Sequence, residues 1–589
     1  MRIYGIPASD YRKKFINITK RGIRMKKRKL LTSLSILMAL VFILGACGNK
    51  TAQSPDSSGQ PKEAVSSEKP SEEKKASESP TEVKNEPKEL IIGTYMPITT
   101  LVPWKTTSDG DGYVIRQIYH TLVEMNKESK FTPSLAKSWE CAEDGVTWTI
   151  KLRDDVYWQT GNGLFGDEKV QVTAEDVKYS YEYYLLPETG SVRYSNLIES
   201  IKSIDVIDDF TIQFVTNDID VLFEYKMYQN YIIPKKGVEE GWDFHAFPVG
   251  SGAYKFVEHV IDSHVILEKN EDYWKEPALD KITYKIITDK SVSAIALQNK
   301  EIDIALAVLP TEVGAIASKD YLTITDSGIG SLRWIGFNCG HPLFTDPEIR
   351  KALTMAVDID GAVKAIFAND ANIDLAVRAY GPISPERPGS NQEGWKGLTP
   401  SYNPEEAQKI LESKGWAKGS DGIYAKDGQR FSFKLQVGNN DANREKLAVI
   451  VSSQLQAIGI ECTAQTVEWG THTDDIKYGN VEMYILGGYG NLDGPYRLMH
   501  SDESNFSPNC KYASDEVDRL LEEAYKTIDY DARVKLIYDA SAIFVSENAH
   551  LGGYFEYAQV GYNNRVTDFD YATVYNALCS EERNVGIAD

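Results

Sequence analysis

Histidine and cysteine, the side chains best suited to metal binding or nucleophilic attack, are thinly spread along this chain. The eight histidines, at positions 120, 245, 259, 264, 341, 472, 500 and 550, include no pair spaced i and i+4, the spacing that places two imidazoles on one helix face. GxSxG, HExxH, CxxC and P-loop patterns are absent from the sequence, which removes the commonest signatures of hydrolases, zinc proteases, dithiol redox proteins and NTPases. We therefore expect no catalytic residues, no resident metal and no cofactor. The sequence favours a protein that binds a ligand over an enzyme that converts one.

Two weaker patterns in the sequence resemble metal or disulfide sites. Ser108-Asp109-Gly110-Asp111-Gly112 resembles the start of a calcium loop, but the next ligand position is Tyr113, so the run of oxygen ligands stops. Beyond Cys47, the remaining cysteines at 141, 339, 462, 510 and 579 are odd in number and widely separated. This spacing argues against a disulfide framework and a metal cluster, and leaves a single bridge open.

The N-terminal segment has the layout of a secretory signal. The basic cluster Lys26-Lys27-Arg28-Lys29 precedes residues 30–46, which carry no charge and end in Leu44-Gly45-Ala46-Cys47. That ending resembles the bacterial lipobox, in which the Cys47 thiol is lipidated and becomes the mature N-terminus. We interpret 1–24 as an upstream extension, with translation starting at Met25, and 25–46 as a lipoprotein signal peptide. An uncleaved anchor or an ordinary signal peptide is the alternative.

Composition separates a tether from an acidic body. Residues 47–88 are rich in Ser, Pro, Glu and Lys with few large apolar side chains, which predicts a disordered tether. Because residues 1–46 contribute +10 to a formal charge of −22, residues 47–589 carry −32. So acidic a body repels phosphate backbones, and nucleic-acid binding is excluded.

Residue patterns in the body predict strands and helices of a mixed α/β protein. Residues 89–96 and 146–153 read as strands, the second with a period of two. Thr173-Ala174-Glu175-Asp176 predicts a capped helix start. From about 345, the start of a helix is predicted at two places, Asp346-Pro347-Glu348 and Asn403-Pro404-Glu405. Apolar stripes at helical spacing follow around 447–458 and 517–525, and these are interpreted as core faces.

Several segments, taken in order, resemble the family 5 solute-binding proteins of ABC importers (oligopeptide, dipeptide and nickel type). The likeness runs from about 89 to 565 and rests on segments 135–140, 144–145, 148–153, 156–158, 172–177, 248–254, 272–274, 297–303, 337–338, 344–360, 381–383 and 402–404. Any one segment is weak alone; their order along the chain makes the resemblance specific.

The resemblance implies an α/β fold of the periplasmic-binding-protein type II kind (cluster C-like), with two lobes and three domains joined by a two-strand hinge. Domain I would comprise 89–124, 239–335 and 560–589, the inserted domain II 125–238, and domain III, the second lobe, 336–559. The hinge strands are expected near 335–338 and 557–562. A ligand held between the lobes stabilises the bound conformation by its differential affinity for it.

The resemblance also points to candidate ligand contacts. Relatives usually anchor the ammonium group of a peptide on an Asp in a Gly- and aromatic-rich loop, which here is 487–496. Asp493 is the acidic residue of this loop, and Asn491 lies where several relatives have the anchoring Asp. A carboxylate suits an ammonium group as water is expelled, although Asp493 equally fits a turn-forming role. Tyr489 and Tyr496 flank the loop, and Trp104 is expected on the opposite wall. Arg497 and Arg378 are interpreted as surface residues rather than ligand contacts.

These readings together imply a lipid-anchored, extracytoplasmic receptor that captures oligopeptides and delivers them to an ABC permease, as a monomer. The long tether favours the outer face of a Gram-positive membrane, with a periplasmic location as the alternative. A nickel chelate, an oligosaccharide or a signalling molecule is the alternative cargo, and a surface enzyme or adhesin on the same scaffold is the third hypothesis.

Overall fold

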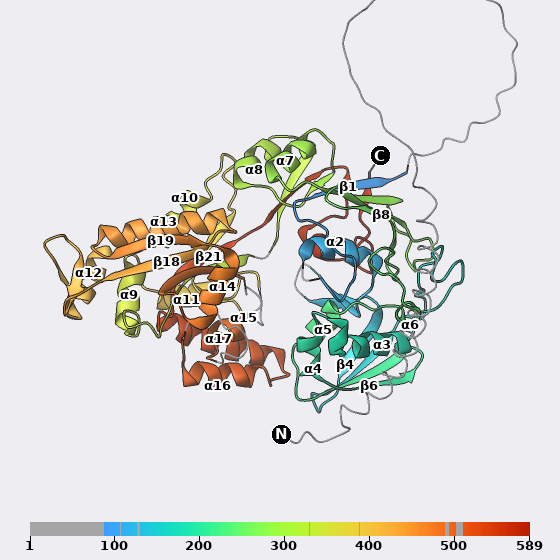
Figure 1. The fold of residues 1–589 in the computed structure, drawn as a ribbon, viewed down its shortest axis with the longest axis horizontal. Coiled ribbons are helices and arrows are strands. Elements are labelled where there is room, and N and C mark those ends of the chain that lie inside the picture. Colours follow the sequence, from blue (N-terminus) through green and yellow to red (C-terminus); the bar gives the residue numbers. More distant parts are fainter. Residues whose placement is uncertain are drawn as a thin grey trace, which may run out of the picture. The chain divides into compact units, whose positions relative to one another are not determined.

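The computed structural model describes residues 87–106, 108–126, 130–328, 330–387, 389–488, 494–501 and 511–588. The predicted upstream extension, signal peptide and lipidation site at Cys47 lie outside these residues, as does nearly all of the predicted tether. The described chain folds into two lobes (Figure 1), the first coloured blue to green with a red C-terminal segment and the second yellow to red.

The first lobe is built on a sheet of seven strands in the order β12-β22-β11-β1-β10-β9-β8. Their bounds are β1 Glu89–Thr94, β8 Tyr254–Val260, β9 His264–Lys269, β10 Lys281–Ile286, β11 Ile304–Ala305, β12 Leu322–Asp326 and β22 Gln559–Asn563. β1 pairs in parallel with β10 and β11, and its Leu90 and Ile92 are buried. Strand β22, far along the chain, completes this sheet.

A second sheet of the first lobe has the order β4-β5-β7-β6. It contains β4 Ala136–Cys141, β5 Thr147–Leu152, β6 Ile201–Asp208 and β7 Thr211–Thr216. The helices of the first lobe are α2 Asp109–Ile118, α3 Ala174–Tyr184, α4 Tyr194–Ile198, α5 Phe223–Gln229, α6 Lys235–Glu240, α7 Lys290–Gln298 and α8 Pro310–Ala317, with 3-10 turns at Pro187–Thr189 and Tyr571–Tyr575. One apolar cluster runs through both sheets, including Ile92, Ile150 and Phe214.

The second lobe is built on a six-stranded sheet in the order β14-β21-β13-β20-β18-β19. Its strands are β13 Ser331–Phe337, β14 Ala376–Ala379, β18 Ser432–Gly438, β19 Glu461–Val467, β20 Met483–Gly487 and β21 His550–Glu556. Its helices are α9 Pro347–Met355, α10 Ile359–Ile366, α11 Gln392–Leu398, α12 Pro404–Ser413, α13 Ala442–Ala457, α14 Trp469–Tyr478, α15 Gly494–Met499, α16 Asp515–Ala524 and α17 Tyr530–Ser546.

Small two- and three-stranded ladders complete the described structure. They pair β2 Val123–Met125 with β3 Phe131–Pro133, β15 Ala417–Lys418 with β16 Tyr424–Lys426 and β17 Gln429–Arg430, and β23 Val566–Thr567 with β24 Gly586–Ile587.

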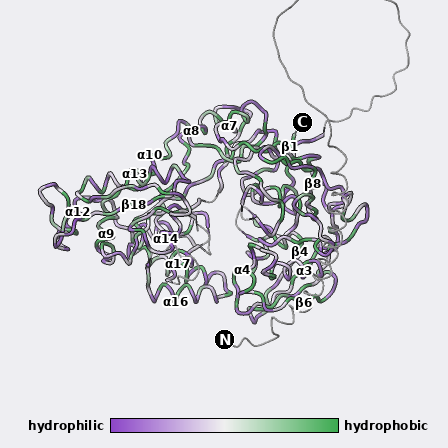
Figure 2. Tube along the Cα trace, viewed as in Figure 1, coloured by the Kyte–Doolittle hydropathy of each residue, from purple (hydrophilic) through white to green (hydrophobic). Residues whose placement is uncertain are grey.

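The six-stranded sheet of the second lobe is buried on both faces, because apolar side chains point to each side of its strands in alternation. In β20, Met483 and Ile485 join the core beneath α9, α10 and α13, whereas Tyr484 and Leu486 join the core beneath α14 to α17. Successive strand side chains point to opposite faces, so a strand buried on both sides is apolar throughout. Figure 2 shows hydrophobic and hydrophilic segments alternating along the trace of both lobes, as one-sided burial of the outer helices requires.

The local elements predicted from the sequence are confirmed. Helix α3 begins at the predicted capping box, where the Asp176 carboxylate accepts from the backbone N–H of Thr173 at 3.0 Å. Asp346 caps α9 by accepting from the N–H of Glu348 at 2.9 Å, and Asn403 caps α12 in the same way. The apolar stripes around 447–458 and 517–525 lie on α13 and α16.

The chain passes between the two main sheets twice. The first passage leaves β12 at Asp326 and enters β13 at Ser331; the second leaves β21 at Glu556 and enters β22 at Gln559. The expected position of the first hinge strand, 335–338, was wrong, because residues 335–337 lie inside β13, paired with β20. That segment reads as an extended linker in the sequence because nothing local shows that strands from distant segments flank it.

Candidate functional site

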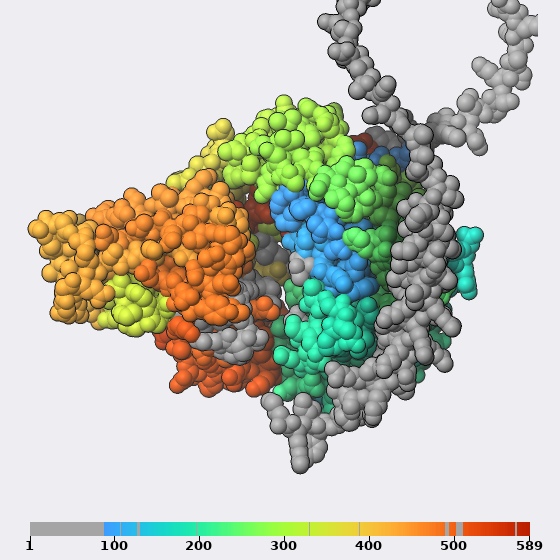
Figure 3. Space-filling model, in the orientation of Figure 1, coloured from blue at the N-terminus to red at the C-terminus, as the bar shows by residue number. Residues whose placement is uncertain are grey.

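A large cleft lies between the two lobes, with a volume of about 2190 Å³. The first lobe contributes the first wall, mainly from Tyr95 and Met96 just after β1, from α2, from the α4–α5 region and from residues 570–576. The second lobe contributes the second wall, from the start of β13, the start of α13, residues 525–537 and the end of β21. The two passages between the sheets line the cleft between these walls, and the space-filling view shows the hollow between the lobes (Figure 3).

The two passages are tied together by Glu386. Its carboxylate accepts hydrogen bonds from the hydroxyl groups of Tyr557 and Ser384, and from the backbone N–H of Gly330 at 3.4 Å. Ser384 in turn accepts from the same N–H at 3.0 Å. Gly330 belongs to the first passage and Tyr557 to the second, so one carboxylate holds both hinge strands.

The second wall carries a compact network of charges. Asp441, at the N-cap of α13, accepts from the N–H groups of Asn443 and Arg444 at 3.0 and 3.1 Å. Its Oδ2 lies 2.9 Å from Arg444 Nε and 3.3 Å from Arg333 Nε. Arg333 Nη2 also lies 3.4 Å from Glu556 Oε2. Two carboxylates and two guanidinium groups therefore neutralise one another.

Burial and charge act in opposite directions on these two carboxyl groups. For Asp441, burial raises the pKa, but Arg444 and Arg333 together outweigh it and leave the pKa lowered. For Glu556, burial is the largest influence and exceeds the opposing effect of Arg333, so its pKa is raised. Asp441 is the residue that holds the network in its charged form.

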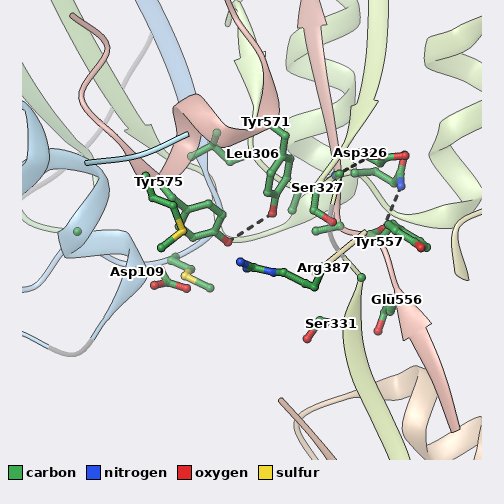
Figure 4. Close-up of a pocket in the computed structure, with 18 of the residues that line it drawn as sticks. Asp109, Leu306, Asp326, Ser327, Ser331, Arg387, Glu556, Tyr557, Tyr571 and Tyr575 are labelled. Atoms are coloured by element: carbon green, nitrogen blue, oxygen red, sulfur yellow. Dashed lines mark hydrogen bonds between the residues drawn. The ribbon is translucent and has the colours of Figure 1, made fainter. Parts of the chain in front are cut away.

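Tyrosine dominates the first wall. The cleft is lined by ten described tyrosines, at positions 95, 113, 225, 228, 231, 525, 530, 557, 571 and 575, seven of them on the first wall. The hydroxyl groups of Tyr571 and Tyr575 lie 3.4 Å apart, and Arg387 extends between them and the hinge (Figure 4). Burial raises the pKa of Tyr95 to about 12, so its hydroxyl stays neutral and can donate at neutral pH.

The described cleft lining is basic although the chain is acidic. It contains nine Lys and Arg residues and six Asp and Glu residues, whereas the whole chain carries −22. Low-dielectric walls of one sign focus the field into a cleft. The cleft is therefore better suited to anionic or dipolar solutes than the protein surface as a whole.

The two lobes also meet at the rim opposite the passages. A side-chain carbon placed at Gly145, in the turn after β4, would lie 2.6 Å from Cδ1 of Ile528 in the second lobe and 3.1 Å from Cγ1 of Ile219. Gly145 adopts φ +71, a conformation that favours glycine. The small residue is needed here both for the turn and for the approach of the second lobe.

Of the residues predicted as ligand contacts, Tyr489, Asn491 and Asp493 lie outside the described residues. Trp104 is 6% exposed and packs edge-on against Tyr183 and Phe244 in the first lobe, and it is not among the residues that line the cleft. The contact between Trp104 and the ligand stays a prediction, and the packing of the indole ring does not support it.

Tyr496 lies in α15 next to the cleft-lining Tyr525. Its ring stacks on His500 with centroids 4.3 Å apart and contacts Tyr525 at 4.9 Å. Tyr496 therefore supports a cleft residue from behind, and a direct ligand contact for it stays a prediction. Arg497 is exposed, and Arg378 pairs with Asp360 while lying 4.7 Å over the ring of Tyr380.

Sequence reasoning missed Arg116, Glu386 and the Asp441 network. Asp441 alone carried a local signal, since an Asp ahead of a helical stripe predicts an N-cap. The others come from ordinary helix, loop and strand positions, and only tertiary contacts bring them to the cleft.

No cation site was found in the described residues. They contain no group of three or more His, Cys, Asp or Glu side chains arranged to hold a metal, and the four described cysteines at 141, 339, 462 and 579 are free thiols. Asp111, from the calcium-like run, instead accepts from the N–H of Thr99 at 2.6 Å and from the hydroxyl of Thr106 at 2.6 Å. Asp111 therefore closes a local loop rather than binding a cation.

None of the helices in the described ranges combines the length and the apolar character needed to cross a membrane.

Two lobes connected by two passages of the chain, with a large cleft between them, form the architecture of a receptor that holds its solute between lobes. Residues 130–508 match the family of bacterial extracellular solute-binding proteins, family 5 (middle region). The oligopeptide-binding protein AppA of Bacillus subtilis is 27% identical over 546 residues, covering 88% of this chain and 92% of that protein. The fold agrees with the crystal structure of the same relative bound to a nonapeptide (TM-score 0.66, 24% identity, 86% of this chain and 100% of that chain).

The fold also agrees with NikZ of Campylobacter jejuni in complex with Ni(L-His) (TM-score 0.67, 24% identity, 85% of this chain and 99% of that chain). The chain belongs to the family 5 bacterial extracellular solute-binding proteins. This family consists of receptors rather than enzymes, and its fold is the α/β, two-lobed and three-domain fold expected from the sequence.

Proposed function

We propose that this protein is the lipid-anchored substrate-binding component of an ABC importer, which captures oligopeptides in the cleft and delivers them to the permease. The size of the cleft carries the proposal. Small-molecule sites usually occupy about 300–1,000 Å³, and this cleft measures about 2190 Å³. A solute of several residues fits such a volume better than a single amino acid or a metal chelate.

The lining supports the same cargo class. Ten tyrosines provide flat apolar faces with neutral hydroxyl groups, which contact peptide side chains and backbone without demanding one sequence. AppA, at 27% identity over most of both chains, is an oligopeptide-binding protein. The domain division into 89–124, 239–335 and 560–589, with 125–238 inserted and 336–559 as the second lobe, is part of the proposal, except that its boundary at 335/336 falls inside β13 and moves to the passage before Ser331.

The nature of the anchor is inferred from the sequence. The Leu44-Gly45-Ala46-Cys47 run follows an apolar segment and a basic cluster, and two or three acyl chains on Cys47 would hold the receptor at the membrane. Intact-mass analysis of the membrane-extracted protein tests this directly. We expect a diacylglyceryl mass on Cys47 in the wild type and none in Cys47→Ala; an unmodified Cys47 would contradict the anchor.

Native mass spectrometry of the purified protein, followed by release and sequencing of bound compounds, tests the cargo. We expect peptides of several lengths to co-purify and to be displaced by added peptide. A single sugar, a metal complex or another small solute in their place would overturn the peptide assignment and favour the alternative cargo. Chemical conversion of a bound compound would overturn the receptor role itself.

A further inference from the structure

Arg116 brings a guanidinium group to the cleft without the paired carboxylate that Arg333 and Arg444 share on the opposite wall. Arg116 lies in the last turn of α2 and lines the first wall. Its Nη1 atom is buried and has no hydrogen-bond partner, and no ion pair of Arg116 occurs among the described residues. On the second wall, by contrast, Arg333 and Arg444 share Asp441.

The surroundings of Arg116 are aromatic rather than acidic. Tyr228, Tyr231 and Tyr575 line the same two cavities as Arg116, and Asp109 acts on the guanidinium group only through electrostatics. The hydroxyl of Tyr228 already donates to the backbone carbonyl of Tyr575 at 3.0 Å. The other nearby acid, Glu124, is already engaged by Arg583 at 3.1 Å.

A second arginine adds positive charge to the first wall near Arg116. Arg193 also lines the first wall, and its buried Nε has no hydrogen-bond partner within the described chain. It acts electrostatically on Tyr184, whose hydroxyl donates to the carbonyl of Tyr231 at 2.6 Å. Both arginines therefore approach the part of the cleft around Tyr231.

The backbone is shaped to admit the Arg116 side chain. A Cβ at Gly112, one helical turn earlier, would lie 2.5 Å from Nη1 of Arg116. The guanidinium group thus lies back along α2 over the space that a larger residue would fill. Arg116 also borders a second, separate cavity of about 20 Å³, which has room only for a water-sized group, so a larger partner must approach from the cleft.

We propose that Arg116 is an anion subsite that binds a carboxylate group of the cargo. The proposal rests on the peptide-receptor function and narrows it to peptides that present a carboxylate to the first wall, either at the C-terminus or on an acidic side chain. A guanidinium group binds a carboxylate through two parallel N–H···O bonds, and a buried, unpaired charge gains most from such a partner.

Paired peptides separate the two sources of the carboxylate. The first pair is one pentapeptide with either a free or an amidated C-terminus. The second pair has an amidated C-terminus in both members and carries either Glu or Gln at the central position. Dissociation constants are measured by calorimetry on the full-length protein in detergent. We expect at least one pair to show a tenfold or larger preference for the carboxylate form, and the pair that does so identifies the source.

Three variants test whether Arg116 makes this distinction. In Arg116→Gln the preference falls to about one, while the affinity for the uncharged peptide stays within twofold. In Gly112→Ala the new methyl group displaces the guanidinium group and the preference also falls. Lys446→Gln, which removes an exposed cleft charge, keeps the preference. An unchanged preference in Arg116→Gln or in Gly112→Ala, or an equal loss in Lys446→Gln, overturns the proposal.

Two further readouts keep this inference separate from the proposed function. If no peptide binds, the peptide function fails, and glutarate becomes the probe: thermal stabilisation of the wild type that Arg116→Gln abolishes supports the subsite, and its absence in the wild type overturns it. The melting temperature of ligand-free Arg116→Gln should equal or exceed that of the wild type. A drop of several degrees would show instead that Arg116 is a structural residue.

Discussion

The two walls of the cleft handle charge in opposite ways. On the second wall, Arg333, Arg444, Asp441 and Glu556 neutralise one another within 3.4 Å. On the first wall, Arg116 lies among tyrosines with a buried Nη1 that has no partner in the described residues. A self-neutralised wall keeps its shape without cargo, whereas an unneutralised one leaves part of its interaction free energy for the cargo to supply.

The contrast also bears on how the lobes respond to a ligand. A bound solute shifts the interlobe equilibrium only by its difference in affinity for the two arrangements. A carboxylate taken by the first wall and a peptide body resting on the second would satisfy that condition, because each wall alone offers an incomplete set of contacts. Three substitutions test this difference between the two walls.

The largest expected effect comes from breaking the second wall's network. Asp441→Asn keeps an N-cap side chain for α13 but removes the shared counter-ion of Arg333 and Arg444. Removing one partner of a buried pair typically costs ~3–5 kcal/mol, and we expect about 3 kcal/mol because Glu556 still faces Arg333. Urea unfolding monitored by tryptophan fluorescence measures the loss.

Asp109→Asn is the matched control on the first wall. Asp109 is an exposed cleft carboxylate with no ion pair within the described residues, and surface changes of this kind stay within about 0.5 kcal/mol. Equal destabilisation by the two substitutions would contradict the difference between the walls.

A smaller, pH-dependent effect is expected behind the first wall, at Glu124. Burial outweighs the attraction of Arg583 and raises the pKa of Glu124 from 4.5 to about 7. Because the folded-state pKa is the higher one, the stability that Glu124 contributes is complete below pH 4.5 and is lost as the pH rises toward 7. Between pH 4.5 and 6 this amounts to about 2 kcal/mol.

Glu124→Gln should remove this part of the pH dependence while retaining an acceptor for Arg583. Unfolding free energies of wild type and variant are compared at pH 4.5, 6 and 7, so that other titrating groups cancel. If the difference between the two proteins stays constant over this range, Glu124 does not titrate as stated.

The smallest effect is expected where the walls join. Glu386→Gln weakens the bonds to Tyr557 and Ser384 and so loosens both passages. Hydrogen bonds to charged groups are worth about 1.5–3 kcal/mol when buried; Glu386 is exposed, and we expect about 1 kcal/mol or less. Amide exchange at Gly330, whose N–H is held by Ser384 at 3.0 Å, should then accelerate up to about fivefold.

Glu393→Gln, in the same region of the chain but 86% exposed and paired with Lys396, should leave that exchange rate unchanged. Equal acceleration in both variants would show a general charge effect rather than a hinge contact.

Local structure could be predicted well from the sequence. Asp346 and Asn403 begin helices because their side chains accept from free N–H groups two or three residues further on. At the start of α3 the Asp176 carboxylate accepts from the N–H of Thr173. The ordered segments from 135 to 404 were enough to predict the family and its two-lobed fold. The hinge was misplaced because Ile335, Gly336 and Phe337 gain their strand partners from β20 and β21, more than a hundred residues away.

The cleft was harder to predict. Trp104 was expected on the wall opposite the 487–496 loop from the resemblance, yet its ring packs against Tyr183 and Phe244. Arg116 looked like any basic residue at a helix end; that it lacks a counter-ion depends on where Glu124 and Arg583 lie. Glu386 carries no local pattern at all.

The sequence by itself determined where the capped helices α3, α9 and α12 begin, the acidic charge of the body and the membership of the family, because these depend on neighbouring residues and on composition. Only the tertiary structure decided which charges are neutralised and which face the cleft. Coulomb and desolvation free energies depend on distances and burial between segments far apart in the chain, and no local pattern of residues specifies those.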